Sequence, residues 1–298
     1  MKHLAKSVSG LSLALALVAC GISPEERLDR AETAFVENRY SEARLDLASV
    51  LEEDAANATA LELMARTQLQ LGDGDGAAST LARLEELGHK PGDFATLMAE
   101  ADLLRGRYEE ALVAGKALAS AEGARIAALA HIGLGDPQAA QAAFEAGQQR
   151  PGDASRLLSD YALFILRAGD PAAAERLATS ARSKAPQGLD PLVASARIAE
   201  ARGKQRDALG YYTAASERYP ESRPAILGRI GVLGNLGRLD EARPMIEQLA
   251  RRTPEDSDVL YLQARLAAEE EAWGDVRDIL QPVEQSEDTR LQLLYARA

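Results

Sequence analysis

Glycine recurs along this chain at a nearly constant interval, and that interval constrains the fold more than any other feature of the sequence. The spacings are 34, 29, 34, 34 and 34 residues, through Gly72, Gly106, Gly135, Gly169, Gly203 and Gly237. Glycine at the end of a helix adopts a positive φ without a Cβ clash. A fixed period of this length is typical of repeat architectures. We therefore expect each glycine to close one helix before the next begins.

Small residues fill two further columns in register with the glycines. The column seven residues before the glycines holds Ala65, Ala99, Ala128, Ala162, Ala196 and, as the exception, Ile230, and it extends to Ala31, Ala264 and Ala298. The column five residues after the glycines holds Ala77, Ala111, Ala140, Ala174, Ala208 and Ala242, with Ala43 before them and Val276 behind. Small side chains at fixed positions let two helices approach closely. The columns predict paired helices, and hence an all-α chain.

A period of 34 residues, two columns of small residues and prolines that close the unit at Pro186, Pro220 and Pro254 together resemble the tetratricopeptide repeat. The resemblance implies a right-handed superhelical solenoid of helix-turn-helix units. Eight units follow from the columns, over residues 24–290, with a third unit that is five residues short: 24–57, 58–91, 92–120, 121–154, 155–188, 189–222, 223–256 and 257–290. The second helix of the short third unit is expected to end in a tight turn around residues 120–123. Residues 291–298 are expected to form either a capping helix or the first helix of a truncated ninth repeat.

The N-terminus has the pattern of an export signal. Lys2, His3 and Lys6 precede an apolar stretch over residues 11–18, which predicts a signal peptide over residues 1–19. About eight apolar residues are too few to span a membrane, which needs roughly 20. The run Leu-Val-Ala-Cys that ends at Cys20 resembles the bacterial lipobox, and the resemblance implies cleavage before Cys20 and diacylation of its sulfur. A plain signal peptide and a short anchor helix stay open as alternatives.

The resemblance to bacterial lipoproteins also predicts a location. Residues 20–23 would form the lipidated N-terminus and a short linker, because Ser23, Pro24 and Glu26 have the pattern of a helix start. In such lipoproteins an Asp after the cysteine favours the inner membrane, so Gly21 favours the periplasmic face of the outer membrane. We expect a protein held to the membrane through its N-terminal lipid.

Composition narrows the classes of partner. Cys20 is the only cysteine, so no disulfide can form within the chain and packing alone must hold the fold together. Removal of the signal takes away Lys2 and Lys6 and no acid, which leaves 32 basic against 46 acidic side chains, a formal charge of −14. Such an acidic surface repels phosphate backbones. The sequence predicts protein partners of the cell envelope rather than nucleic acid.

Catalytic patterns are missing from the sequence. The three histidines, His3, His89 and His131, stand far apart in the predicted elements, and the chain has neither a His-Glu-x-x-His run nor a Gly-x-Ser-x-Gly elbow. We therefore expect no enzymatic activity, no catalytic residues, no metal site and no cofactor.

The resemblance to tetratricopeptide proteins implies that ligands contact the second, fifth, ninth and twelfth positions of each unit, on the first helix. Transferred residue by residue, these positions give a candidate partner-binding set of Glu62, Arg66, Leu69, Arg125, Leu163, Leu166, Arg197, Tyr261 and Arg265, with Leu129 and Val193 beside them. Arginine pairs in bidentate fashion with carboxylates or phosphates. The alternative for each arginine is a pair with an acidic residue on the adjacent helix.

These observations predict a lipid-anchored envelope scaffold or adaptor that binds a protein partner in its concave groove and supports assembly of an envelope complex. Ser23 to Arg27, the run from Asn38 to Ala43, and Leu87-Gly88 before the short unit also resemble the N-terminal part of long lipoproteins associated with exosortase and exopolysaccharide systems. That resemblance implies an alternative: a component of an exopolysaccharide export or protein-sorting system that contacts glycan or polymer machinery. A purely structural spacer is a third possibility.

Overall fold

The protein is all-helical in the computed structural model, which describes residues 22–298. These residues form seventeen α-helices and two short 3₁₀ helices, and no strand occurs among them. The predicted fold class, all-α with helices packed in pairs, is confirmed. The predicted signal peptide over residues 1–19 and the lipid site at Cys20 lie outside the described residues.

The helices form pairs, so that a first helix and a second helix alternate along the chain. The first helices of the pairs are α1 (Pro24–Val36), α3 (Ala58–Gln70), α5 (Phe94–Leu104), α7 (Ala121–Gly133), α9 (Ser155–Arg167), α11 (Leu189–Ala201), α13 (Arg223–Asn235) and α15 (Ser257–Glu269). The second helices are α2 (Tyr40–Glu53), α4 (Gly74–Glu86), α6 (Tyr108–Ala117), α8 (Pro137–Gly147), α10 (Pro171–Lys184), α12 (Gln205–Arg218), α14 (Arg243–Arg252) and α16 (Trp273–Leu280). The 3₁₀ helices η1 (Leu239–Ala242) and η2 (Gln281–Val283) and a last helix, α17 (Thr289–Arg297), complete the chain.

The repeated glycines do close the first helices. All six have a positive φ, between 68° and 90°. The same position in the first and last units holds Asn38 and Glu271, with φ of 61° and 59°. Neither residue is glycine, so the column in the sequence did not include them. Asparagine tolerates this conformation better than most residues.

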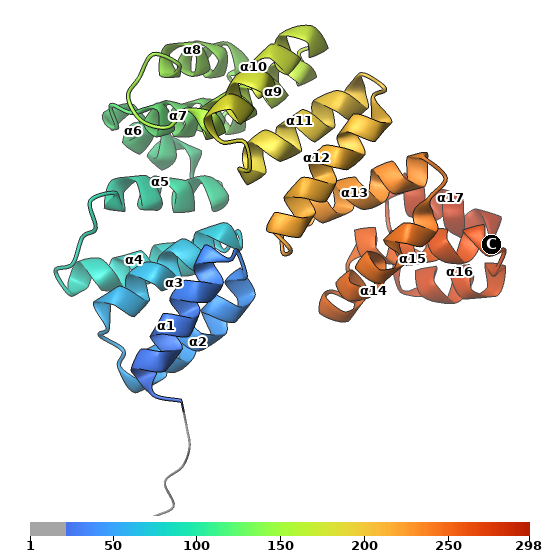
Figure 1. Ribbon diagram of the computed structural model, residues 1–298, viewed down its shortest axis with the longest axis horizontal. Helices are drawn as coiled ribbons and strands as arrows, with labels where there is room; N and C mark the ends of the chain where they lie inside the picture. The colour runs from blue at the N-terminus through green and yellow to red at the C-terminus, as the bar shows by residue number, and fades with distance from the viewer. Residues whose placement is uncertain (1–21) are drawn as a thin grey trace, which may run out of the picture.

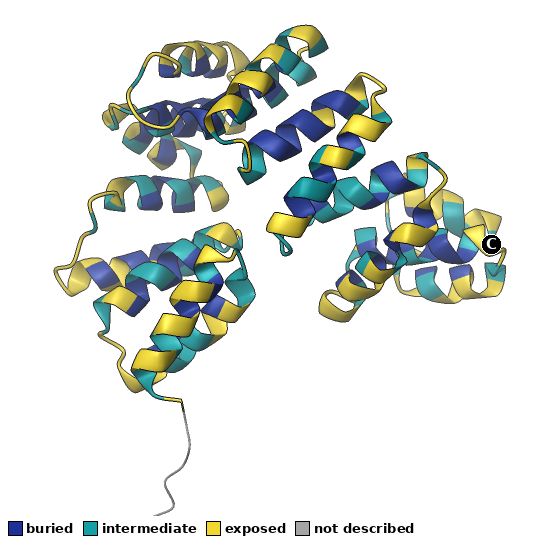
Figure 2. Cartoon of the chain, viewed as in Figure 1, coloured by how far each residue is buried: buried dark blue, intermediate teal, exposed yellow. Residues whose placement is uncertain are grey.

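The two columns of small residues form the centre of the core. Ala65, Ala99, Ala128, Ala162 and Ala196 are fully buried, and so is every alanine from Ala77 to Ala242 in the second column. Figure 2 shows buried residues along the faces where neighbouring helices meet. Interiors packed to crystal-like density leave no room at such contacts for a larger side chain. The short side chains therefore set the distance between helices in most pairs, whereas Ile230 and Val276 are the larger residues that occupy these columns.

The end of the short third unit differs from the tight turn that the sequence predicts at residues 120–123. Helix α6 ends at Ala117, and the Ser120 hydroxyl already caps the next helix by accepting a hydrogen bond of 3.1 Å from the Gly123 amide. Gly123 is thus buried inside α7 rather than in a turn. A Cβ at Gly123 would lie 2.4 Å from the Leu118 Cβ. Glycine stands there because α7 passes close to the end of α6.

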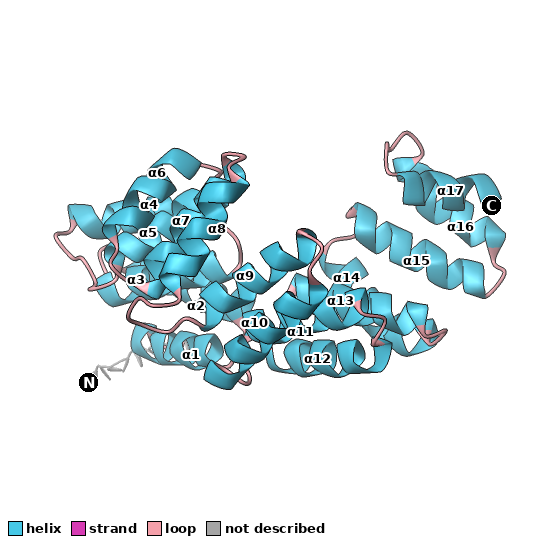
Figure 3. Cartoon of the chain, turned by 90° about the horizontal axis from the view of Figure 1, so that it is seen from above, coloured by secondary structure: helices cyan, strands magenta, loops and turns pink. Residues whose placement is uncertain are grey.

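The array is strongly curved. Figure 1 shows it rising from α1–α4 through α5–α10 and returning through α11–α13, so that the end of α12 faces the first repeats, and Figure 3 shows the same curve from above. The first helices line the inner side of the curve. Most residues around the cavity on that side belong to α3, α5, α11 and α13.

At the C-terminal end, Leu291 of α17 is buried in one cluster with Leu260 and Leu280. No helix in residues 22–298 combines the length and the apolar character that crossing a bilayer requires.

Enlarging an alanine of the column should destabilise the fold in proportion to its burial. We expect Ala128→Leu to reduce the free energy of unfolding by about 1–3 kcal/mol, since the extra atoms must displace a neighbouring helix. The matched control is Ala146→Leu on exposed surface of α8, which should change it by about 0.5 kcal/mol or less. Urea denaturation followed by circular dichroism measures both. Equal effects of the two variants would contradict this account of the core.

Candidate functional site

The inner surface of the curve contains two adjoining cavities. One, of about 300 Å³, is lined by Leu69, Gln70, Glu100, Leu103, Leu104, Tyr108, Arg125, Leu129 and Arg156. The other, of about 490 Å³, shares Leu69, Gln70 and Leu104 with the first and continues to Leu189, Val193 and the loop after α12. We call this combined surface the concave groove. Its floor is mainly aliphatic, and Leu104 remains half exposed, at 50%.

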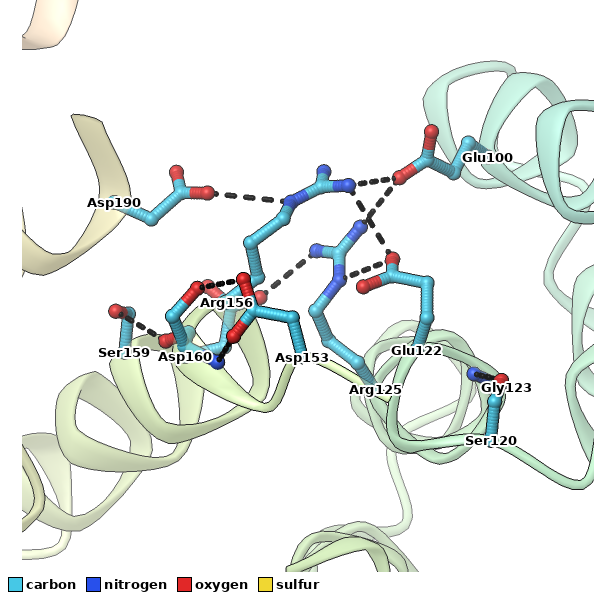
Figure 4. Close-up of polar contacts among 11 residues, drawn as sticks. Glu100, Ser120, Glu122, Gly123, Arg125, Asp153, Arg156, Ser159, Asp160 and Asp190 are labelled. Atoms are coloured by element: carbon cyan, nitrogen blue, oxygen red, sulfur yellow. Dashed lines mark hydrogen bonds and ion pairs between the residues drawn. The ribbon is translucent and has the colours of Figure 1, made fainter. Parts of the chain in front are cut away.

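Arg125 is the most buried cation of the groove. Its side chain is 8% exposed and contacts three carboxylates from three different helices. The guanidinium donates to Glu100 at 2.9 Å, to Glu122 at 2.6 Å and to Asp160 at 2.9 Å (Figure 4). The planar group with five donors suits such branched pairing, which a lysine could not reproduce.

Arg156 extends this arrangement toward the next repeat. Its guanidinium donates to Glu100, lies 3.4 Å from Glu122, and pairs with Asp190 of α11 at 3.2 Å (Figure 4). The side chain is 42% exposed, so solvent screens these contacts more than those of Arg125. We call Glu100, Glu122, Arg125, Arg156, Asp160 and Asp190 the groove network. It ties together helices α5, α7, α9 and α11.

The groove network has four carboxylates and two guanidiniums. Burial raises the pKa of Glu122 and of Asp160, against the opposing effect of Arg125. For Glu100 burial acts in the same direction, but the charges of Arg156 and Arg125 outweigh it and lower the pKa. Burial alone would lower the pKa of Arg125, yet the carboxylates around it, Asp160 first, raise it. Arg125 therefore stays charged and compensates carboxylates that would be costly to ionise without it.

The other predicted arginines of the groove fall into two groups. Arg66 forms a bidentate pair with Asp93, both bonds 2.8 Å long, and a bond of 2.9 Å to Glu62. Arg197 is exposed and makes no ion pair with any residue in 22–298. Arg66 and Arg125 thus follow the alternative of neighbouring acidic partners, whereas Arg197 does not.

Outside the two cavities of the groove, toward the C-terminal end of the array, an aromatic ring lies close to two cations. The guanidinium of Arg265 is 5.9 Å from the centroid of the Tyr261 ring, and that of Arg290 is 5.1 Å from it. Arg290 also pairs with Asp258 at 2.8 Å. The ring of Tyr261 is therefore engaged within the protein by its own arginines.

The predicted aliphatic residues are not equivalent. Leu69 and Leu129 line the smaller cavity, and Val193 lines the larger one. Leu166 is partly buried and packs against the core cluster of Ala162 and Ile198, and Leu163 is also partly buried. Neither Leu163 nor Leu166 lines the two cavities of the groove.

Several groove residues were missed in the sequence. Glu100 occupies the ninth position of the short third unit, and Arg156 and Asp190 occupy the second positions of the fifth and sixth units. Transfer of the second, fifth, ninth and twelfth positions in every unit would have identified these three residues. Leu104 and Asp160 lie outside the four positions and had no signal in the sequence. Within residues 22–298, no three His, Cys, Asp or Glu side chains are grouped so as to hold a metal ion.

Comparison with known proteins agrees with the repeat pattern. A sequence profile described as tetratricopeptide repeat matches residues 34–101 and 199–266. The stacked helix pairs in the rest of the chain continue the same unit. The chain thus contains tetratricopeptide repeats. No curated protein matches the sequence.

Solved structures were compared with this fold, and the similarity in sequence is low. A chain in the crystal structure of the APC/C hetero-tetramer Cut9-Hcn1 is similar with a TM-score of 0.63 and 13% identity, over 92% of this chain and 55% of that chain. The present chain therefore spans about half the length of that relative. The tetratricopeptide-repeat domain of P58(IPK) matches at 13% identity and a TM-score of 0.33, over 92% of this chain and 96% of that one. The first likeness shows the fold alone.

Loss of the buried cation should destabilise the protein in a pH-dependent way. We expect Arg125→Met to reduce the free energy of unfolding by about 3–5 kcal/mol at pH 7, because Glu100, Glu122 and Asp160 would stay buried without their main cation. Arg156→Met, at a more exposed position, should cost about 1 kcal/mol.

The sign of the pH dependence follows from the carboxylates. Removing Arg125 raises the folded-state pKa of all three carboxylates, of which Glu122 and Asp160 already lie above their unfolded values. The penalty is therefore largest above the folded pKa and shrinks as protonation removes the charge. Thermal and urea unfolding between pH 7 and about 4 should show the deficit of Arg125→Met decreasing toward acid. A deficit that is constant over this range would show that the loss is one of packing and not of charge.

Proposed function

We propose that the protein is a scaffold or adaptor that binds a protein partner in the concave groove. Tetratricopeptide repeats mediate protein–protein binding, and stacked repeats use their concave surface for it. The observation that supports this best is the groove itself. Its two adjoining cavities combine an accessible aliphatic floor with a fixed polar border.

The two parts of the groove would contribute differently to binding. Leu69 and Leu104 offer apolar surface whose burial against a partner is favourable. The groove network supplies charges that ion pairs on several helices hold in place, so little ordering is needed when a partner arrives. Apolar contacts would then provide most of the affinity, and the network would provide specificity.

Charge favours a particular class of partner segment. Carboxylates outnumber guanidiniums in the groove network by four to two, and Asp190 at its edge is 45% exposed. The whole chain carries a formal charge of −12. A partner segment with both aliphatic and basic side chains is complementary to this surface.

The cell envelope is the proposed place of this activity. The run that ends at Cys20 supports export and lipid attachment, and Gly21 favours the outer membrane. Helix α1 begins with a capping box, in which Ser23 and Glu26 each bond the other's backbone amide. Only Gly21 and Ile22 separate Cys20 from that cap. A lipid on Cys20 would keep the first repeats close to the membrane, where the groove would support assembly of an envelope complex.

A crosslinking experiment tests the binding function. A photo-crosslinking residue replaces Leu104 in the anchored protein in its native cell, and captured species are identified by mass spectrometry. The matched control places the same residue at Arg176, which is exposed on the second helix α10 and lies outside the groove. We expect one discrete envelope protein to be captured from position 104 and not from position 176, and the capture to weaken several-fold when Asp190, the exposed carboxylate at the edge of the groove, is changed to Lys.

Other results would redirect the proposal. A smear that carries glycan, captured from position 104, would favour the exopolysaccharide-export alternative. Capture of nothing from any groove position would favour a structural spacer. Both outcomes would contradict an adaptor that binds protein.

The lipid anchor can be tested separately. We expect Cys20→Ser to abolish incorporation of radiolabelled palmitate and to move the protein from the membrane fraction to the soluble fraction, since the cysteine sulfur is the attachment atom. Ser23→Ala, three residues away, should leave both unchanged. Palmitate labelling that persists in Cys20→Ser would contradict the assignment.

A further inference from the structure

Two repeats that are far apart in the sequence touch across the mouth of the groove. The Asn38 side-chain amide donates to the backbone carbonyl of Arg218 at 3.1 Å. Both the backbone amide and the hydroxyl of Ser41 donate to the Glu221 carboxylate, at 2.8 Å and 3.0 Å. We call these three hydrogen bonds the closing contact. It joins residues 180 positions apart, where a solenoid ordinarily has contacts only between neighbouring repeats.

The closing contact satisfies groups that a helix leaves unpaired at its ends. Helices α4, α8 and α10 are each capped by an aspartate side chain, at Asp73, Asp136 and Asp170. Helix α2 instead follows Arg39, which makes no side-chain cap bond. Glu221 takes over that role from the sixth repeat, and its negative charge suits the N-terminus of a helix.

The first repeat departs from the glycine column at the position that makes this contact. Asn38 has the positive φ of the glycines, but its side chain reaches the end of α12. The Tyr40 hydroxyl donates to the Asn38 side-chain oxygen at 2.8 Å and so orients the amide. Burial, together with the nearby Tyr219 and Glu221, raises the pKa of Tyr40 to about 12, which keeps this hydroxyl protonated. A glycine would give the same turn without the bond.

The closing contact borders the groove directly. Tyr40, Tyr219 and Glu221 line the larger cavity together with Leu69 and Val193. Among the described residues, none of the apolar core clusters joins the first repeat to the sixth. Polar bonds therefore hold the two repeats together without a shared apolar core. Such a contact can open without unfolding either repeat.

We propose that the closing contact is a latch, which holds the first six repeats in a closed curve and controls the access of large groups to the concave groove. Its regulatory meaning rests on the proposed function, because it decides when a partner can enter. The latch itself can be tested without a partner.

The test relies on Cys20 being the only native cysteine, because replacing it leaves a chain without thiols. In the full chain with Cys20→Ser, the added substitution Leu104→Cys places one thiol in the groove. Its labelling rate is measured with a bulky maleimide-polyethylene glycol and, as a reference, with small N-ethylmaleimide. The ratio of the two rates reports how often the groove opens enough for the bulky reagent.

Two variants of the latch and one control decide the outcome. Glu221→Ala removes the cap of α2, and Asn38→Gly keeps the turn but removes the bond to Arg218. We expect each to raise the rate ratio by about fivefold, the usual equilibrium effect of losing one helix cap. Glu217→Ala, on exposed surface at the end of the same helix α12, should leave the ratio unchanged.

The possible results separate the latch from the binding function. A rate ratio that is the same in all variants would overturn the latch, whatever the photo-crosslinking at position 104 shows. A higher ratio in both latch variants, with hydrogen exchange accelerated at the first amides of α2 and unchanged in α9, would establish it. It would do so even if no protein partner were captured, in which case only the proposed function would fail.

Discussion

Close approach of helices through small side chains is the constraint on which the rest of this structure depends. The fully buried alanines set one packing distance that is repeated in most pairs, and the residues with positive φ set one turn between the two helices. Since every repeat uses the same two devices, the array bends in one sense and places its first helices on the inside (Figure 1). The concave groove is thus a consequence of packing in the core, with no separate structural element needed to build it.

The groove network depends on this frame because all of its ion pairs except Arg125–Glu122 join two different helices. Burying carboxylates and guanidiniums costs desolvation energy, and such a cluster contributes little net stability compared with apolar packing. Its value lies in geometry, since Arg125 can satisfy Glu100, Glu122 and Asp160 together only when α5, α7 and α9 stand in register. A change in the stacking of the short third unit would therefore disturb the polar border of the groove before it disturbed the core.

Sequence patterns predicted the local structure well and the distant contacts poorly. The columns identified the helix pairs because each column reflects a short-range requirement, a positive φ or a small side chain. Transfer of family positions placed Leu69 and Arg125 at the groove, but the acidic partners of Arg125 depend on which helices stand side by side. Asn38 and Glu271 were missed because residues other than glycine can adopt the same turn. The bond from Asn38 to Arg218 had no local signal, since it requires the summed curvature of six repeats.

That summed curvature gives the first repeat an unusual position. In an open solenoid a terminal repeat has one neighbour, and stability is the sum of intrinsic and nearest-neighbour terms. Here the first repeat has a second contact, because Glu221 caps α2 from the sixth repeat. The free energy of that contact depends on every junction between the two, so a small shift at each junction would accumulate and break it. The polar latch is therefore the part of the molecule most sensitive to its curvature, and it stands where a partner would enter the groove.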